Sequence, residues 1–532
     1  MREIRAKRIL IIVAIVILVS IFIHLGIEKD IWFCDEVYSY TSANAQSFRK
    51  PIFQYSNIWV SGKDVIHYLS ANDRSLRFRE ISQYLFNDHV PLYFWLLRIA
   101  SIVAVGSCSK WVGLSINIVF YIVLFFCLLT IFDRKNIGNT KQSTSYLAVV
   151  LSLVCLLHPV VLSEALTIRM YLMFTLAQVF ILMFVKEESY TIMSYVKLSI
   201  SALFGILTHF YFWIWLAFFS VFYLIYLMVR KGSTKRIHKV VCYMIAMLTA
   251  LGVATALFPN WFTNIFNNTT SKGHLSFQKI FVSGDLVVEI SRAIHTIVSY
   301  LTTGNNMLIP VSVFVIVALV YIICKNNEPI VWLSVLSGIA YAVFVIHTQP
   351  SVEGRYLWSA AIMILIAFLI MLKEDLQFLM QKIYVTDVNT FYATTGIIVM
   401  LILVNISLTF QNDYKNIQYL KDRTMEEHQA IKAENDHPWI VFHDSTNWVF
   451  LCSMYDFTIP DKVKRVNLNE EGQYDEVIQN ASEVIVYTID NSKSIEDCIK
   501  YIEQSCNKRA CAYEKISKSY AMSVYKIRLE VR

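Results

Sequence analysis

The stretch ILIIVAIVILVSIFIHLGIEKDIWFCDEVYSY, residues 9–40, joins a long apolar run to an acidic dipeptide set among aromatic residues. The run 9–26 is long enough to cross about 30 Å of hydrocarbon as a helix. It follows the basic leader MREIRAKR and has no small-residue cleavage site, so we predict a retained membrane anchor. The pair Asp35-Glu36 alone fits a helix-start cap. Its place directly beyond an anchor also fits chemistry at a membrane surface.

The composition indicates a membrane protein. Of the 532 residues, 56% are hydrophobic and only 16% are charged, whereas soluble domains carry about 25% charged residues. The net charge of +7 is spread through short loops, so no nucleic-acid partner is expected. The ten cysteines are scattered without a CxxC pair, which excludes a zinc knuckle and an obvious disulfide framework.

Apolar runs recur to about residue 410 and predict a polytopic α-helical membrane protein. The run 198–228 is too long for one span, so we divide it near Thr208-His209. The eleven predicted spans are 9–26, 111–132, 144–162, 169–186, 193–208, 210–229, 239–258, 306–324, 329–347, 356–372 and 390–410.

The basic residues of three short segments predict the orientation, because such segments stay in the cytoplasm. The leader, DRKNIGNTK and RKGSTKRIHK fall on the same side in the eleven-span count. The N-terminus is therefore expected inside. The stretch 27–110, the loop 259–305 and everything after residue 410 are expected outside.

Two regions outside the spans are expected to be structured. Stretch 27–110, the first extracytoplasmic loop of a transmembrane domain 1–410, should hold a helix over DEVYSYTSANAQ and an interfacial helix over DHVPLYFWLLRIASIVAV. Residues 411–532 should form a small extracytoplasmic α/β domain. Its strands are predicted at WIVFHDS and EVIVYTID, its helix at SIEDCIKYIEQSCNK, and a last strand or hairpin at ACAYEKISKSYAMSVYKIRLE.

Polar residues from several helix ends converge at the outer face in this topology. Each has an ordinary structural explanation. The arginines could be interface anchors, the histidines could be packing or helix-entry residues, and Glu164 and Glu353 could pair with nearby arginines. Because all of these residues are expected at the same depth in the membrane, a functional site is favoured. The residues are Asp35, Glu36, Asp88, His89, Glu164, Arg169, His209, Glu353 and Arg355.

The segments WFCDEVYSY, HVPLYFWLLR, HPVVLSEALTIRMY, THFYF and GRYLW, in this order, resemble the membrane glycosyltransferases of the GT-C fold. The branch that they resemble includes protein O-mannosyltransferases and the lipid A aminoarabinose transferase. The resemblance covers residues 1 to about 375. Glu164 and Arg169 are separated by ALTI where the family has them nearly adjacent, which puts the role of Glu164 in doubt. The C-terminal domain matches no pattern of the family.

The resemblance implies inverting transfer of a hexose or pentose from a polyprenyl-phosphate donor to a glycan, lipid or protein acceptor. It implies Asp35 as the general base, with Glu36 beside it. Arg169 and Arg355, with His89 and Tyr356, would bind the donor phosphate. The chain has no Gly-rich phosphate loop, which disfavours a soluble nucleotide-sugar donor.

Several alternatives stay open from the sequence. His89, His209 and a carboxylate such as Glu36 or Asp88 could hold a divalent metal ion, or His89 could hydrogen-bond the phosphate directly. A transporter or flippase for a lipid-linked glycan would also place carboxylates and arginines in a membrane cavity. A scaffold that binds a lipid-linked sugar without transferring it, and a ligase of whole oligosaccharides, remain further alternatives. The expected location is a bacterial cytoplasmic membrane.

Overall fold

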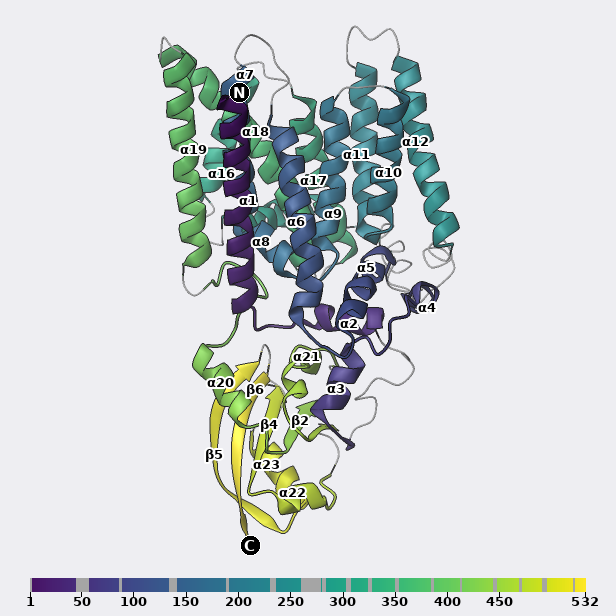
Figure 1. The fold of residues 1–532 in the computed structure, drawn as a ribbon, viewed down its shortest axis with the longest axis vertical. Helices are drawn as coiled ribbons and strands as arrows, with labels where there is room; N and C mark the ends of the chain where they lie inside the picture. Colours follow the sequence, from purple (N-terminus) through teal and green to yellow (C-terminus); the bar gives the residue numbers. More distant parts are fainter. Residues whose placement is uncertain are drawn as a thin grey trace. The chain divides into compact units, whose positions relative to one another are not determined.

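The computed structural model describes residues 2–44, 57–85, 89–133, 141–187, 191–229, 236–259, 279, 284–302, 308–323, 328–349, 354–383, 387–411, 414–443, 447–467, 471–489, 495–519 and 522–532. The chain forms two compact units (Figure 1). The first consists of Met1–Leu25, Ser82–Tyr93 and Leu114–Gln418. The second consists of Gly26–Ile81, Phe94–Gly113 and Tyr419–Arg532.

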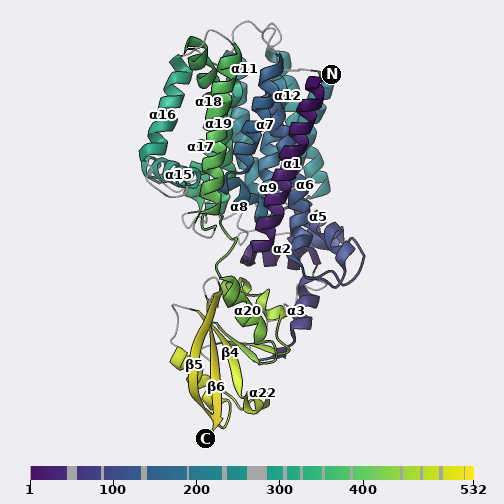
Figure 2. The same cartoon turned by 60° about the vertical axis from the view of Figure 1, so that its left-hand side comes forward.

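The first unit is a bundle of helices (Figure 2). The helices that lie wholly or largely in it are α1 (Arg2–Glu28), α6 (Lys110–Phe132), α7 (Lys141–Leu156), α8 (Pro159–Leu166), α9 (Tyr171–Glu187), α10 (Ile192–Ile206), α11 (Phe210–Val229), α12 (Arg236–Leu257), α15 (Leu286–Leu301), α16 (Leu308–Ile323), α17 (Pro329–Thr348), α18 (Trp358–Ile383) and α19 (Asp387–Phe410).

Seven helices of the described chain are long and apolar enough to cross a membrane, or eight if the bent pair α7–α8 is one span. These helices, together with the C-terminal sheet, confirm the prediction of a polytopic helical membrane protein with a small C-terminal α/β region. Each of the eleven predicted spans corresponds to helix, but three of those helices are short. α9, α10 and α16 have 17, 15 and 16 residues, fewer than the roughly 20 that a perpendicular span needs.

The span predicted at 144–162 is broken by His158-Pro159. Proline has no N–H to donate and its ring clashes with the preceding turn, so it ends α7 and occupies the first position of α8. The Nδ1 atom of His158 caps the new helix by accepting a hydrogen bond from the Val160 N–H at 3.3 Å. The two helices meet at a bend of 66°.

The predicted break near Thr208-His209 is confirmed, because α10 ends at Ile206 and α11 begins at Phe210. Gly205 lies against the ring of Phe212, which occupies the space that a side chain at Gly205 would need. The turn therefore depends on this close approach of ring to backbone.

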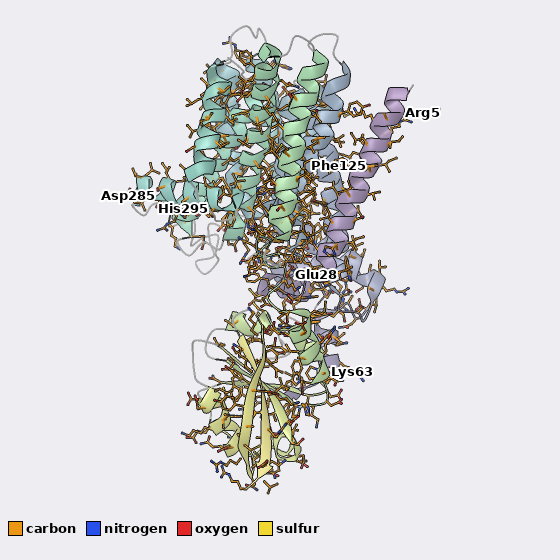
Figure 3. The ribbon with its side chains drawn as sticks, turned by 90° about the vertical axis from the view of Figure 1, so that its left-hand side faces the viewer. Arg5, Glu28, Lys63, Phe125, Asp285 and His295 are labelled. Atoms are coloured by element: carbon orange, nitrogen blue, oxygen red, sulfur yellow. The ribbon has the colours of Figure 1, made fainter. Side chains whose placement is uncertain are left out.

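A helix not predicted from the sequence, α15, lies in the stretch assigned to the loop 259–305. Asp285 caps it, since its Oδ1 accepts hydrogen bonds from the Val287 and Val288 N–H groups at 3.0 and 3.2 Å. Figure 3 shows α15, marked by Asp285 and His295, projecting sideways from the bundle. The spacing of its apolar residues is amphipathic, which is the sequence signal that indicates a helix here.

The second unit contains a sheet of six described strands in the order β1-β3-β2-β4-β6-β5. Neighbours β3, β2 and β4 are parallel, and the remaining pairs are antiparallel. The strands are β1 (Trp59–Val60), β2 (Trp439–His443), β3 (Val463–Asn467), β4 (Glu483–Ile489), β5 (Lys508–Ser519) and β6 (Met522–Val531). The predicted strands and C-terminal hairpin therefore form.

The helices of the second unit include both helices predicted in the first loop, α2 and α5. The full set is α2 (Cys34–Asn44), α3 (Gly62–Leu69), α4 (Phe78–Tyr84), α5 (Leu92–Ser101), α20 (Met425–Ala433), α21 (Asn447–Leu451), α22 (Glu476–Asn480) and α23 (Ile495–Gln504), of which α4 and α5 extend into the first unit. The core between the sheet and α23 includes Ile440, Phe442, Val484, Val486 and Ile502, all fully buried.

Strand β1 comes from the stretch 27–110 and pairs with β3 of the C-terminal segment. The Trp59 indole N–H donates to Asp475 Oδ2 at 2.9 Å, and Lys464 lies 5.1 Å from the Trp59 ring centroid while its Nζ is 2.6 Å from the same carboxylate. The first loop and the C-terminal segment thus share one fold, whereas the sequence treats them as separate regions.

Candidate functional site

The predicted site residues divide between the two units. His89, Arg169, His209, Arg355 and Tyr356 belong to the first unit. Asp35 and Glu36 belong to the second. Asp88 and Glu353 lie outside the described residues.

Arg169 lies in the turn between α8 and α9 and is only 2% exposed. Its Nη2 donates to the Nε2 atom of His89 at 2.8 Å. The turn is held by Asn117 of α6, whose Nδ2 donates to the carbonyl oxygens of Ala165 and Thr167 at 2.8 and 2.7 Å. Because both carbonyls lie where α8 ends, this side chain satisfies groups that the helix leaves unpaired.

Glu164 does not pair with Arg169 in the described structure. It is fully buried, and its Oε1 accepts a hydrogen bond from the Thr175 hydroxyl at 2.9 Å. The four intervening residues ALTI carry Arg169 past the end of α8, so the two side chains have different neighbours.

Arg355 lies in a short 3₁₀ helix, Gly354–Leu357, and is 5% exposed. Its Nε donates to the hydroxyl of Tyr171 at 2.9 Å, and its guanidinium carbon lies 5.2 Å from the Tyr356 ring centroid. The 3₁₀ helix is tied to α17 because the Tyr341 hydroxyl donates to the Tyr356 carbonyl at 2.8 Å.

The two arginines are brought together through the start of α9. Arg169 precedes α9 by two residues, and Tyr171, its first residue, accepts the hydrogen bond from Arg355. Guanidinium groups stay charged at any physiological pH. We call His89, Arg169, Tyr171, Arg355 and Tyr356 the arginine cluster; two buried permanent cations make it suited to a phosphate or another anion.

His209 lies among aromatic rings beside this cluster. Its ring stacks on Phe174 at 5.5 Å with an interplanar angle of 12°, and it lies 5.9 Å from the ring of Tyr171. Its Nδ1 accepts a hydrogen bond from the Tyr211 N–H at 3.0 Å. The neutral ring therefore carries its proton on Nε2.

The adjacent acids Asp35 and Glu36 lie in the first turn of α2, and they differ in their contacts. Glu36 is fully buried; its Oε2 accepts from the Phe33 N–H at 2.9 Å, and its Oε1 lies 3.1 Å from Nζ of Lys29. Glu36 thus caps the helix and forms a buried ion pair. Asp35 is 9% exposed, and its carbonyl oxygen accepts from the Ser39 hydroxyl at 2.9 Å. The capping role expected of the pair falls to Glu36.

The predicted metal ligands have other partners in the described structure. Nε2 of His89 accepts from Arg169, and Nδ1 of His209 accepts from the Tyr211 N–H. Glu434, His437 and Glu483 form another group with metal-like spacing in the second unit. The ammonium of Lys526 already lies 3.0 and 2.9 Å from its two carboxylates.

Two contact residues, one in each unit, were not singled out from the sequence. Tyr171 is the last residue of the segment HPVVLSEALTIRMY. That segment was recognised as a motif, but no role was assigned to this tyrosine. Lys29 has no such signal, because a lysine directly after an anchor is typical of an interface residue.

No protein-family model matches the chain, and no curated protein matches it. Solved structures do. ArnT from Cupriavidus metallidurans bound to undecaprenyl phosphate is 12% identical, with 96% of this chain and 97% of that chain covered at a TM-score of 0.44. The apo oligosaccharyltransferase of Archaeoglobus fulgidus is 10% identical, with 88% and 69% covered at 0.42.

AglB of the same archaeon, in complex with an inhibitory peptide and a dolichol-phosphate, is 10% identical, with 88% and 69% covered at a TM-score of 0.40. TM-scores below 0.5 describe a distant likeness. Over most of its length, the chain is similar to the lipid A aminoarabinose transferase ArnT and to the archaeal oligosaccharyltransferase AglB, which are GT-C glycosyltransferases.

Proposed function

We propose that this protein is an integral membrane glycosyltransferase that moves a sugar from a polyprenyl-phosphate donor to an acceptor hydroxyl on the extracytoplasmic face. The observation that carries the proposal is the arginine cluster: Arg169 and Arg355 are both buried, and Arg355 donates to the hydroxyl of Tyr171, two residues after Arg169. These residues belong to segments that also resemble such transferases.

The chemistry assigns one role to each group. Asp35 takes the proton of the acceptor hydroxyl as its oxygen attacks the anomeric carbon. The bond from that carbon to the phosphate oxygen breaks, and its electron pair leaves with the phosphate. Arg169 and Arg355 offset the charge that develops on the phosphate, and attack from the opposite side inverts the anomeric centre. In this scheme Glu36 positions α2 through its cap and its ion pair with Lys29.

The location that fits this role is a bacterial cytoplasmic membrane, with the N-terminus in the cytoplasm and the second unit outside. The donor would enter from the membrane with its phosphate at headgroup depth. The acceptor hydroxyl belongs to a glycan, a lipid or a protein. No step requires a metal ion, because the two guanidinium groups supply the positive charge.

Asp35→Asn tests the base. A positioned base contributes roughly 10²–10⁴-fold, so the variant should lose transfer by about that factor while its unfolding temperature stays that of wild type. Transfer is measured in proteoliposomes containing lipid-linked sugars and cell-envelope extract from the source cells. The readout is release of free polyprenyl phosphate by mass spectrometry, and Asp436→Asn, an exposed acid in the second unit, is the matched control.

Arg169→Lys accompanies that test. It keeps the charge but loses the fork that bonds His89, so we expect weaker donor binding together with slower transfer. Wild-type transfer by Asp35→Asn would remove Asp35 as the base. Unchanged donor binding and rate in Arg169→Lys would leave Arg169 as a structural anchor.

One observation favours transport of a lipid-linked glycan as the second candidate. The bent pair α7–α8 interrupts a span, and Glu164 is buried in α8, the second helix of the pair. Interrupted helices with buried acids are typical of transporters. A flippase would move labelled lipid-linked sugar across vesicles without acceptor, whereas a transferase releases polyprenyl phosphate only when acceptor is present.

A further inference from the structure

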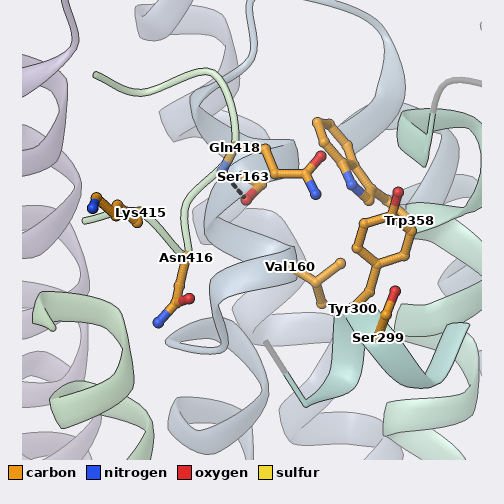
Figure 4. Close-up of a pocket in the computed structure, with 8 residues that line it drawn as sticks. All are labelled: Val160, Ser163, Ser299, Tyr300, Trp358, Lys415, Asn416 and Gln418. Carbon is orange, nitrogen blue, oxygen red and sulfur yellow. Dashed lines mark hydrogen bonds between the residues drawn. The ribbon is translucent and has the colours of Figure 1, made fainter. Parts of the chain in front are cut away.

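A cavity of about 230 Å³ lies in the first unit among α8, α15, the start of α18 and the segment 415–418 (Figure 4). Its volume is close to the lower end of the range for small-molecule sites. The polar and aromatic side chains that line it are those of Ser163, Ser299, Tyr300, Trp358, Lys415, Asn416 and Gln418.

The cavity has two aromatic walls. Tyr300 comes from the last turn of α15, and Trp358 is the first residue of α18. Figure 4 shows both rings on the same side of the cavity. Aromatic faces of this kind bury apolar C–H surface while the edges of the cavity stay polar.

The polar side of the cavity is held in place by local hydrogen bonds. The Ser163 hydroxyl accepts from the Gln418 N–H at 2.9 Å, and Asn416 Nδ2 donates to the Leu408 carbonyl at 2.7 Å. These contacts hold the segment 415–418 against α8 and α19.

The groups that face the cavity are neutral. Hydroxyls come from Ser163, Ser299 and Tyr300, and amides come from Asn416 and Gln418. Lys415 belongs to the wall, but Figure 4 shows its side chain pointing away from the other residues. Aromatic faces beside neutral donors and acceptors suit a ligand rich in hydroxyl groups and without net charge.

The cavity adjoins the arginine cluster at two points. The Trp358 ring lies 5.8 Å from that of Tyr171, which accepts the hydrogen bond from Arg355. Gly354 is the residue that precedes Arg355. The Tyr300 hydroxyl occupies the space that a side chain on Gly354 would need. An occupant of the cavity therefore lies one ring away from the residues that hold the phosphate.

We propose that this cavity binds a neutral sugar ring, with Tyr300 and Trp358 against its apolar face and the amides and hydroxyls at its edge. The inference rests on the proposed glycosyltransferase function and names a saccharide site beside its phosphate-binding cluster. The ring belongs either to the donor or to an acceptor glycan; both present the same chemistry to the cavity.

Saturation-transfer NMR on the full-length protein tests sugar binding directly. The protein is purified in an amine-oxide detergent, because glycoside detergents would compete for the site. The probes are glucose, arabinose and N-acetylglucosamine, with glucuronate and glucosamine as charged probes. We expect saturation transfer to at least one neutral sugar, and little to the charged ones. Binding of the charged probes alone, or of none, would overturn the proposal.

Ser299→Phe places a ring in the cavity and should weaken binding at least tenfold, which corresponds to about 1.4 kcal/mol. Ser291→Phe makes the same change at an exposed position of α15 and should bind as wild type does. Gln418→Met removes an edge amide at similar size, so it tests the site even if Ser299→Phe fails to fold. Wild-type binding by a folded Ser299→Phe or by Gln418→Met would contradict the assignment.

Transfer assays distinguish the two sources of the sugar. If the ring is the donor's, excess lipid-linked sugar restores the rate of Ser299→Phe; if it is the acceptor's, excess envelope extract restores it. Restoration by neither would overturn the placement of the sugar. The proposed function can fail separately from the sugar site. If the wild-type protein binds sugar but releases no polyprenyl phosphate, the sugar site is supported and the transferase function is contradicted.

Discussion

The neighbours Asp35 and Glu36 differ in what each contacts, although they are chemically alike. Glu36 and Lys29 are paired where both side chains are fully buried. Removal of one partner from a buried pair leaves an uncompensated charge, which costs about 3–5 kcal/mol. Lys29→Met should therefore lower the free energy of unfolding by about this amount, measured by thermal unfolding of the purified protein.

The control for that measurement is the double variant Lys29→Met/Glu36→Gln. The glutamine carries no charge and keeps an oxygen for the Phe33 N–H, so most of the lost stability should return. If single and double variants unfold at the same temperature, the ion pair does not account for the burial of these side chains.

Asp30 lies in the link between α1 and α2. Its raised pKa predicts that the stability of the protein depends on pH. Burial raises the pKa of Asp30 from 3.8 to about 7, with a further increase from the charge of Asp422. A raised pKa means that the folded protein binds this proton more tightly than the unfolded chain does. The contribution of Asp30 to stability is thus complete below about pH 4 and is lost as the pH rises through about 7.

The variant Asp30→Asn isolates this effect. Asparagine stays neutral and can still accept the hydrogen bond that the Asp422 N–H donates to Oδ1 at 3.3 Å. We expect a higher unfolding temperature than wild type at pH 8 and a similar one at pH 4. A wild-type pH profile in the variant would assign the titration to other groups.

At the scale of residues, the sequence singled out both arginines of the cluster, together with His89 and Tyr356, but not Tyr171. The order and spacing of GRYLW and TIRMY marked Arg355 and Arg169. The Arg355–Tyr171 bond joins residues 184 positions apart, and no local pattern encodes such a distance. The ion pair of Glu36 with Lys29 was not predicted for another reason. In the sequence, Lys29 resembles an ordinary interface lysine.

At the scale of elements, the turn between α10 and α11 depends on Gly205. The Phe212 ring lies where a side chain would have to go, so Gly205→Ala should displace that ring and destabilise the protein by about 1–3 kcal/mol. Gly252→Ala is the matched control on α12, with nothing within 4 Å of the added carbon. It should be neutral or gain up to about 1 kcal/mol from helix propensity.

Thermal unfolding of both glycine variants in one detergent gives the comparison. Transfer activity should also fall in Gly205→Ala, because the displaced ring contacts Phe174, on which His209 stacks. Equal unfolding temperatures for the two variants would show that the turn tolerates a side chain.

Hydropathy located the helices but not their ends. α9 begins late because the turn with Arg169 takes the residues before it, and α8 begins at a proline inside a predicted span. β1 has two residues, and its strand partner is distant in the sequence, so no periodicity could reveal it.

At the scale of the whole molecule, orientation in the membrane stays a prediction that one natural cysteine can test. Cys511 lies on β5 in the second unit and is exposed, whereas the other described cysteines are buried or partly buried. A membrane-impermeant maleimide should label wild-type protein in intact spheroplasts through Cys511 and should label Cys511→Ser far less. Labelling that needs permeabilised membranes would place the second unit in the cytoplasm.

The pairing of β1 with β3 has a consequence for biosynthesis. Val60 and Val463 are partners about 400 residues apart. At roughly 5–20 residues per second, the ribosome needs about 20–80 s to reach the second strand after it has made the first. During that interval the first loop lacks the strand with which β1 pairs, while the helices of the bundle are being made. A nascent chain of this protein is therefore most exposed to proteases and in most need of a chaperone at its earliest segment, which is also the segment that carries Asp35.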